Sequence, residues 1–149
     1  MDGMRRAFRD NLVAITRLVV ALSALGYNTW RNERTERNRN VRVAGIEILK
    51  EIGSLQEIVA QVSPGDDDLP GATPHDPRGR LRMGWVNVWT LNDMAAVMPA
   101  DVTREARELE AAWEADVEEL PTSEASSQRI NAAIEELRQA TLASLRALR

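Results

Sequence analysis

The apolar run at residues 12–27, LVAITRLVVALSALGY, constrains this chain more than any other feature of its sequence. A helix built from it would be apolar on every side, whereas a helix on the surface of a globular protein keeps a polar stripe. Extended to residues 11–30, the helix would be about 30 Å long, which matches the hydrocarbon core of a bilayer. Tyr27 and Trp30 would lie one turn apart at its end, where interfacial aromatic side chains gather. We therefore expect residues 1–28 to form a membrane anchor.

Arg17 is the main objection to this anchor. A charge at mid-bilayer costs roughly 2.5–3.5 kcal/mol on insertion scales. However, Arg17 follows Leu12 by only five residues, and helical side chains lean toward the N-terminus of their helix. Its guanidinium can therefore extend back to the nearer interface, which leaves a short membrane span.

Two other interpretations of the N-terminal segment stay open. In a cleaved signal peptide, residues 4–10 would be the basic region, with a small-residue cleavage site near Ser23 or Ala24. In a soluble bundle, the run would be a buried helix. We favour the anchor because the length of the run fits a bilayer and Arg17 interrupts the apolar region that a signal peptide needs.

Charge is distributed unevenly along the chain. Nine arginines and four acidic residues up to Arg42 give +5, whereas ten basic and nineteen acidic residues after it give −9, for a net charge of −4. An acidic body argues against a general nucleic-acid-binding protein, whose basic surface would belong to the folded domain. The basic N-terminal segment instead indicates a chain whose N-terminal part lies near anionic lipid headgroups.

The arginines also bear on membrane topology. Three precede the apolar run, and five follow it closely, at positions 31, 34, 37, 39 and 42. By the positive-inside rule this small excess favours a single-pass protein with its body in the cytoplasm. The five could bind acidic lipid headgroups, or they could serve only as a topology signal. We expect Arg17, Tyr27, Trp30, Arg31 and Arg34 to lie at the membrane interface.

Composition limits the chemistry of the chain. There is no cysteine, which excludes disulfides, cysteine-ligated zinc, iron–sulfur clusters and a thiol nucleophile. Alanine, leucine, glutamate and arginine dominate, and these residues favour helix. No phosphate-binding glycine loop, dinucleotide fingerprint or nucleophile elbow is present, so no cofactor is expected.

Apolar periodicity predicts four helical segments after the anchor. The first covers residues 29–62, with a polar neck at 31–40 followed by a stripe in heptad-like, coiled-coil rhythm. The others cover residues 80–98, 101–120 and 128–148. The alternation around Trp85–Trp89 could also pass for a short strand, but no convincing partner strand exists elsewhere. Residues 63–79 are rich in proline, glycine and aspartate and predict a flexible loop. The stripe positions are Val41, Ala44, Ile48, Ile52, Leu55, Val59 and Val62; Leu81, Trp85, Val88, Trp89 and Asn92; Val102, Ala106, Leu109, Trp113, Val117 and Leu120; and Ile130, Ile134, Leu137, Thr141, Leu145 and Leu148.

Each predicted helix of the body has a single apolar stripe and must pack against others. We therefore predict an all-α fold, in which an N-terminal transmembrane or long hydrophobic helix continues into an antiparallel bundle of three to four helices at residues 29–149.

Two residue sets are candidates for a site. Asp66, Asp67, Asp68, His75 and Asp76 could hold a divalent cation, but their order does not match a calcium-binding loop, and consecutive acids in a loop are more often solvated charge. We therefore expect no metal and no catalytic residue. Trp85, Trp89 and Trp113 could form a partner or pocket surface, or they could fill the bundle core, which their places on apolar stripes favour.

The run LGYNTWRNE at residues 25–33, followed by Asn38, Arg39, Asn40 and Ala44, resembles a pattern in short bacterial proteins of unknown function. Those proteins have an N-terminal hydrophobic helix, a polar neck and a helical body, and the similarity covers residues 12–60. The resemblance implies membrane association, in the bacterial inner membrane, but no activity and no site residues.

The leading hypothesis for function is a membrane-anchored structural or protein-interaction module that binds membrane lipid, an unknown protein partner or a second copy of itself, and no nucleic acid. The alternative is a sensor-type domain that binds a small ligand between helices. An enzyme is not expected, because no acid–base groups are assembled on facing stripes.

Overall fold

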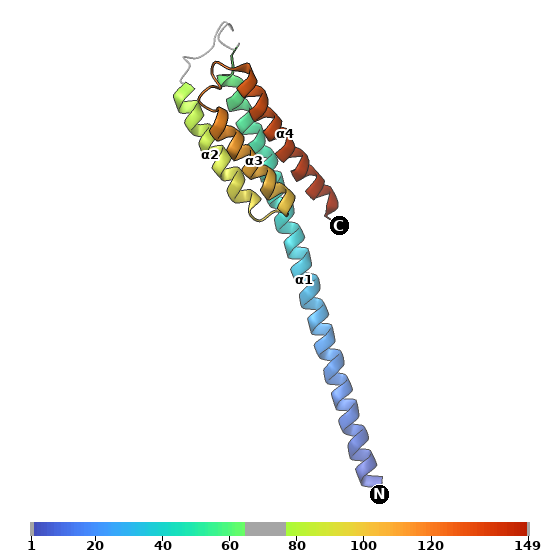
Figure 1. Ribbon diagram of the computed structural model, residues 1–149. Coiled ribbons are helices and arrows are strands. Elements are labelled where there is room, and N and C mark those ends of the chain that lie inside the picture. The colour runs from blue at the N-terminus through green and yellow to red at the C-terminus, as the bar shows by residue number, and fades with distance from the viewer. Residues whose placement is uncertain (1, 65–76, 149) are drawn as a thin grey trace. The chain divides into compact units, whose positions relative to one another are not determined.

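A computed structural model describes the backbone of residues 2–64 and 77–148, with the side chains in these ranges from Thr16 onward except that of Pro77. Its helices are α1 (Asp2–Val62), α2 (Pro77–Ala95), α3 (Ala100–Asp116) and α4 (Glu124–Ala147), shown in Figure 1. No strand occurs in the described ranges, which confirms the predicted all-α class.

The chain divides into two compact units, Met1–Arg39 and Asn40–Arg149. In the first unit the described residues form the N-terminal part of α1, so the predicted polar neck is helical. The second unit holds the rest of α1 together with α2, α3 and α4.

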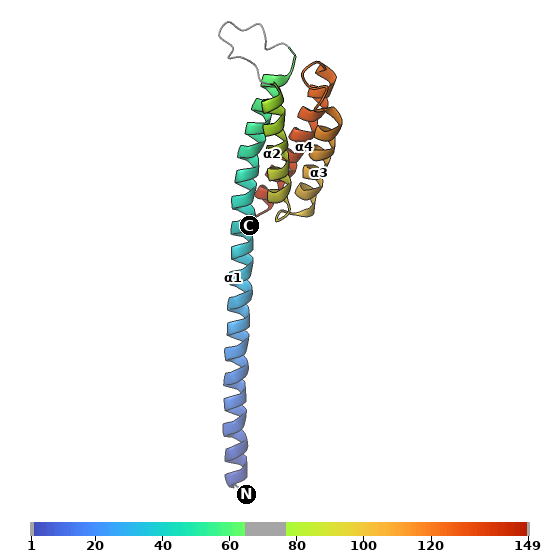
Figure 2. The same ribbon diagram turned by 90° about the vertical axis from the view of Figure 1, so that its left-hand side faces the viewer.

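The second unit is an antiparallel four-helix bundle, as the sequence predicted. Its helices run alternately in opposite directions in both views of the ribbon (Figures 1 and 2). Helix α3 packs against both α2 and α4. Helix α1 is joined to α2 by a hydrogen bond from Arg80 to Gln61, and to α4 by one from Arg138 to Gln56. Each helix therefore contacts two others, and the bundle closes on itself.

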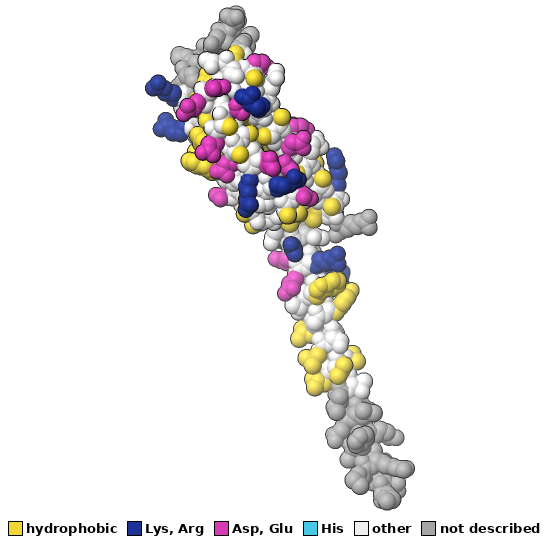
Figure 3. Space-filling view, in the orientation of Figure 1, with side chains coloured by type: hydrophobic (Ala, Val, Ile, Leu, Met, Phe, Trp, Pro, Cys, Tyr) yellow, Lys and Arg dark blue, Asp and Glu magenta, His cyan; other side chains and the backbone are white. Residues whose placement is uncertain are grey.

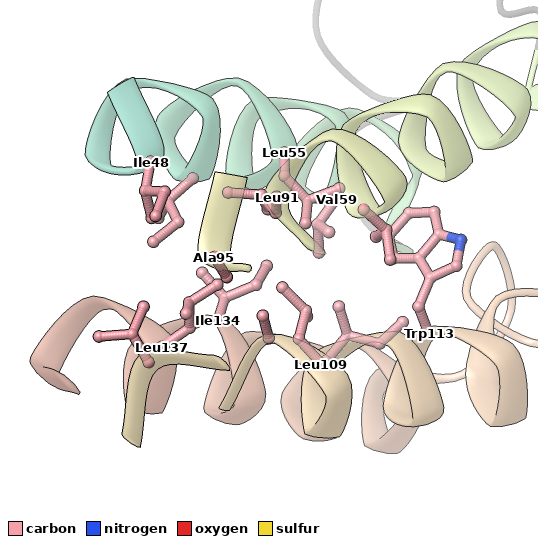
Figure 4. Packing of buried hydrophobic residues seen from close by; sticks show 14 of the residues in the cluster. Ile48, Leu55, Val59, Leu91, Ala95, Leu109, Trp113, Ile134 and Leu137 are labelled. Carbon is pink, nitrogen blue, oxygen red and sulfur yellow. The ribbon is translucent and has the colours of Figure 1, made fainter. Parts of the chain in front are cut away.

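The apolar stripes of the four helices meet in one core (Figure 4). The stripe predicted on α1 is confirmed, because six of its seven residues are buried and Ala44 is half-buried. All six predicted stripe residues of the 101–120 segment are also buried. On α4 the stripe is buried as far as Thr141, and Leu145 and Leu148 are half-buried at the end of the helix.

Helix α2 differs most from the prediction. It begins at Pro77 rather than at residue 80, because proline is tolerated in the first turn of a helix, where the amide hydrogen has no partner. Its buried face is formed by Gly84, Val88, Leu91 and Ala95. Trp89 was predicted on this face and is instead exposed. The prediction was wrong because it followed the large apolar side chains and gave no weight to glycine.

The connection between α3 and α4 also differs from the prediction. The last helix was predicted to begin at residue 128, but α4 begins at Glu124 because the hydroxyl of Ser123 accepts a hydrogen bond from the Ser126 amide at 3.2 Å. Helix α3 ends at Asp116, before the expected residue 120, although Val117 and Leu120 remain buried in the turn that follows.

Two glycines within the bundle predict stability effects of opposite sign. We expect Gly84→Ala to lower the free energy of unfolding by about 1–3 kcal/mol, because its Cβ would overlap the Trp113 ring. We expect Gly53→Ala to raise it by roughly 0.5–1 kcal/mol, because a Cβ there meets nothing within 4 Å and alanine favours helix. Urea unfolding of the full-length variants, followed by far-ultraviolet circular dichroism, measures both, and effects of the same sign would contradict the packing described.

Candidate functional site

The residues predicted at a membrane interface all lie on α1 within the first unit, and all five are exposed. The rings of Tyr27 and Trp30 are 6.1 Å apart between centroids. The guanidinium carbon of Arg34 lies 5.5 Å from the centroid of the Trp30 ring, within the range of a cation–π contact. The structure therefore brings Tyr27, Trp30 and Arg34 together, as their spacing of three and four residues requires.

Large apolar side chains of the same helix are exposed rather than packed. Between 54% and 65% of the surface is exposed for each of Leu18, Val19, Val20, Leu22, Leu25, Tyr27 and Trp30. Figure 3 shows hydrophobic side chains on the surface of this segment, next to a group of basic ones. Apolar surface of this extent is unusual on a soluble monomer and indicates a region that another surface covers.

The transmembrane part of the predicted fold class is not supported. In the part of the chain that the structure describes, no helix combines the length and the apolar character that a membrane span needs. Arg17, Asn28, Arg31 and Asn32 interrupt or bound the apolar stretch within the described residues. The side chains of residues 1–15, which begin the predicted anchor, lie outside the described residues.

The three tryptophans of the bundle are placed at successive depths. Trp113 on α3 is fully buried, Trp85 on α2 is half-buried, and Trp89 is 54% exposed. The Trp85 ring lies 6.5 Å from the Trp113 ring in an edge-on arrangement and 5.5 Å from the Trp89 ring. Trp113 thus belongs to the core, while the exposed Trp89 ring lies against the ring of Trp85.

Exposed apolar side chains continue along the outer face of α2 around Trp89. Met83 and Val86 are each at least 45% exposed. Spacings of three residues place Val86 beside both Met83 and Trp89 on this face. We call Met83, Val86 and Trp89 the α2 strip. From the sequence, Trp89 was named as a possible partner surface but a place in the core was favoured, and Met83 and Val86 were not identified.

A groove of about 590 Å³ lies between α1 and α2 within the bundle. Its most buried polar side chain is Asn87. With its amide nitrogen facing the acceptors, Asn87 donates to the carbonyl of Met83 at 3.1 Å and to Glu51 at 3.2 Å. Gln61, also in the groove, accepts the hydrogen bond from Arg80. The groove is open to solvent, and these polar groups already have partners within the bundle.

One buried carboxylate, Asp116, was not identified from the sequence. The Arg129 guanidinium hydrogen-bonds both of its oxygens, with Nε at 3.1 and 2.9 Å, and Arg129 also donates to the buried Ser126 hydroxyl at 3.1 Å. The hydrogen bond from Arg129 lowers the pKa of Asp116 below its ordinary value of 3.8, against the opposing effect of burial. A lowered pKa keeps Asp116 ionised and makes it a weaker base, so this group joins α3 to α4 rather than carrying acid–base chemistry.

Metal binding finds no support in the described ranges, which contain no group of three or more histidine, cysteine or acidic residues able to hold an ion. The candidate residues Asp66, Asp67, Asp68, His75 and Asp76 lie outside the described residues.

Comparison with known proteins gives no relative from which a role could be carried over. No protein-family model matches the chain, and no significant match was found among the curated proteins or the solved structures.

The Asp116–Arg129 pair predicts a loss of stability at acid pH. Because the pKa of Asp116 is lower in the folded protein, its contribution is fully present above the ordinary value of 3.8 and is lost as the pH falls through the folded value. We expect Asp116→Asn to lower the free energy of unfolding by about 1–3 kcal/mol at neutral pH, and by less as the medium is acidified. Urea unfolding over this pH range checks the effect, with the exposed Glu118→Gln as control; an equal cost at every pH would contradict it.

Proposed function

We propose that this protein is a membrane-tethered helical bundle, in which the N-terminal part of α1 lies in a lipid bilayer and the bundle binds another protein. One observation carries the proposal: the described residues 18–30 form a helix whose apolar side chains are exposed. The proposed membrane is the bacterial inner membrane, as the resemblance of the 25–33 run implies.

The distribution of these side chains favours lipid over a single protein partner. Successive helical residues point about 100° apart, so Leu18, Val19 and Val20 face three different directions. A protein that packs against one face needs only one apolar stripe, whereas lipid tails surround the helix and favour apolar side chains on every side.

The ends of the segment also favour a bilayer. Residues 11–30 would span about 30 Å, and Tyr27 and Trp30 would lie at the level of the headgroups. Arg17 would extend toward the opposite interface, as its position near the start of the apolar run allows. More arginines follow the segment than precede it, which favours a cytoplasmic bundle.

The α2 strip supports the second part of the proposal, protein binding by the bundle. Tryptophan is enriched among the residues that contribute most to protein interfaces. Trp89 is an exposed tryptophan whose ring lies against that of the half-buried Trp85, and Trp85 in turn contacts Trp113. A partner with an apolar surface, including a second copy of this chain, fits such a strip. The open groove between α1 and α2 gives no comparable support for the sensor alternative.

Acidic substitutions in the exposed apolar segment test the tether. In the full-length protein we expect Leu22→Asp/Leu25→Asp to move most of the molecules out of the carbonate-resistant membrane fraction, because each acid costs roughly 2.5–3.5 kcal/mol in a bilayer. The matched control is Val97→Asp, which introduces an acid at an equally exposed apolar position of the bundle. The tether would be contradicted if carbonate extracted the wild-type protein from the membrane fraction, or if the double variant stayed fully in that fraction.

Site-specific photocrosslinking in native membranes tests the α2 strip. A photoreactive side chain at position 86 should give a discrete adduct of higher mass, because Val86 lies next to Trp89 on an exposed face. The same side chain at the exposed Glu136 of α4 is the control. Identical adduct patterns from both positions, or none from position 86, would count against a binding role for the strip.

A further inference from the structure

Basic side chains gather on one face of α1 directly after the exposed apolar segment. Tyr27, Trp30, Arg31, Arg34 and Arg37 follow one another at spacings of one or three residues, which places them on the same side of the helix. Glu36 lies on the opposite side, and Glu33 lies at the edge of this face. We call Arg31, Arg34 and Arg37, with Trp30, the basic face.

The three arginines are available for an anion. Their side chains are exposed, and none of the ion pairs formed within the described part of the chain involves them. Trp30, Arg34 and Arg37 line a surface hollow of about 430 Å³, which Glu33 borders. The contact of Arg34 with the Trp30 ring orients this guanidinium at the junction between apolar and basic residues.

The basic face is long enough to cross a headgroup layer. From Arg31 to Arg37 the helix rises about 9 Å, and each headgroup layer of a bilayer is roughly 5–7 Å thick. Guanidinium groups bind phosphate oxygens through paired hydrogen bonds, which an exposed ammonium group does not provide in the same geometry.

We infer that the basic face binds the phosphate of anionic phospholipid and makes the membrane association of this chain selective for anionic bilayers. This inference rests on the proposed tether and adds lipid selectivity to it. Charge complementarity and the adjacent apolar segment identify the ligand as a lipid phosphate rather than a phosphate free in solution.

Flotation of full-length protein, synthesised in the presence of limiting amounts of vesicles, tests the inference. The vesicles are either phosphatidylcholine alone or an equimolar mixture of phosphatidylcholine with phosphatidylglycerol. From about 1 kcal/mol per arginine near an anionic surface, we expect the lipid needed for half-maximal flotation to fall at least tenfold in the anionic vesicles. At about 1 M salt the Debye length falls to about 3 Å, and this advantage should largely disappear.

Variants separate the basic face from general charge. One triple variant is Arg31→Gln/Arg34→Gln/Arg37→Gln. It should lose most of the preference of the wild-type protein for anionic vesicles and should float with phosphatidylcholine vesicles as the wild-type protein does. The matched control Arg104→Gln/Arg107→Gln/Arg146→Gln removes the same charge from exposed positions of the bundle and should keep the advantage. Millimolar inorganic phosphate should not reduce binding of the wild-type protein to anionic vesicles.

The outcomes distinguish this inference from the proposed function. Flotation with neither kind of vesicle would overturn the tether and the inference together. Equal flotation with both kinds, or equal losses in the two triple variants, would overturn only the lipid selectivity. If inorganic phosphate displaced the protein from anionic vesicles, the anion bound by the basic face would not be specific to lipid, and the lipid assignment would be overturned. An equal gain with phosphatidylethanolamine in place of phosphatidylglycerol would overturn the anionic assignment.

Discussion

The approach of α2 to α3 at Gly84 is the contact that most constrains the bundle. Trp113 is the largest fully buried side chain of the described residues, and its six-membered ring occupies the space that a Cβ at position 84 would fill. At the separation of α2 and α3 in this bundle, the indole has room only because position 84 carries no side chain. The pair therefore fixes the register of the two helices, and this register brings Val88, Leu91 and Ala95 into the core.

The periodicity of apolar residues was sufficient to predict most of this architecture. The stripes on α1 and α3 were predicted almost completely, because each places valine, leucine or isoleucine at regular spacings of three and four with charged residues between them. On α2 the same rule failed, since its apolar residues occur on two faces and glycine occupies a buried position. A helix with apolar residues on two faces does not indicate which face is buried, and only the shape of the opposing residue, Trp113, decides it.

The candidate surfaces were harder to predict from the sequence than the fold was. The Tyr27–Trp30–Arg34 cluster follows from helical spacing alone, whereas the α2 strip requires knowing which face of α2 is buried. Asp116 was missed because its acidic side chain lies at the end of a predicted helix with many exposed acids, and its partner Arg129 is thirteen residues away on the next helix. Such a pair cannot be distinguished from solvated charge until the turn at residues 117–123 places the two side chains together.

The pairing of α1 with α4 has a consequence for the order of events during synthesis. Gln56 bonds to Arg138, eighty-two residues later, and Leu145 packs against Gly45. Translation proceeds at about 5–20 residues per second, so α4 is synthesised several seconds after the residues of α1 that it contacts. During this interval Ile48, Ile52 and Leu55 lack part of their final cover. The nascent chain thus presents an apolar helix early, and chaperones that bind such helices have the opportunity to act before the bundle closes.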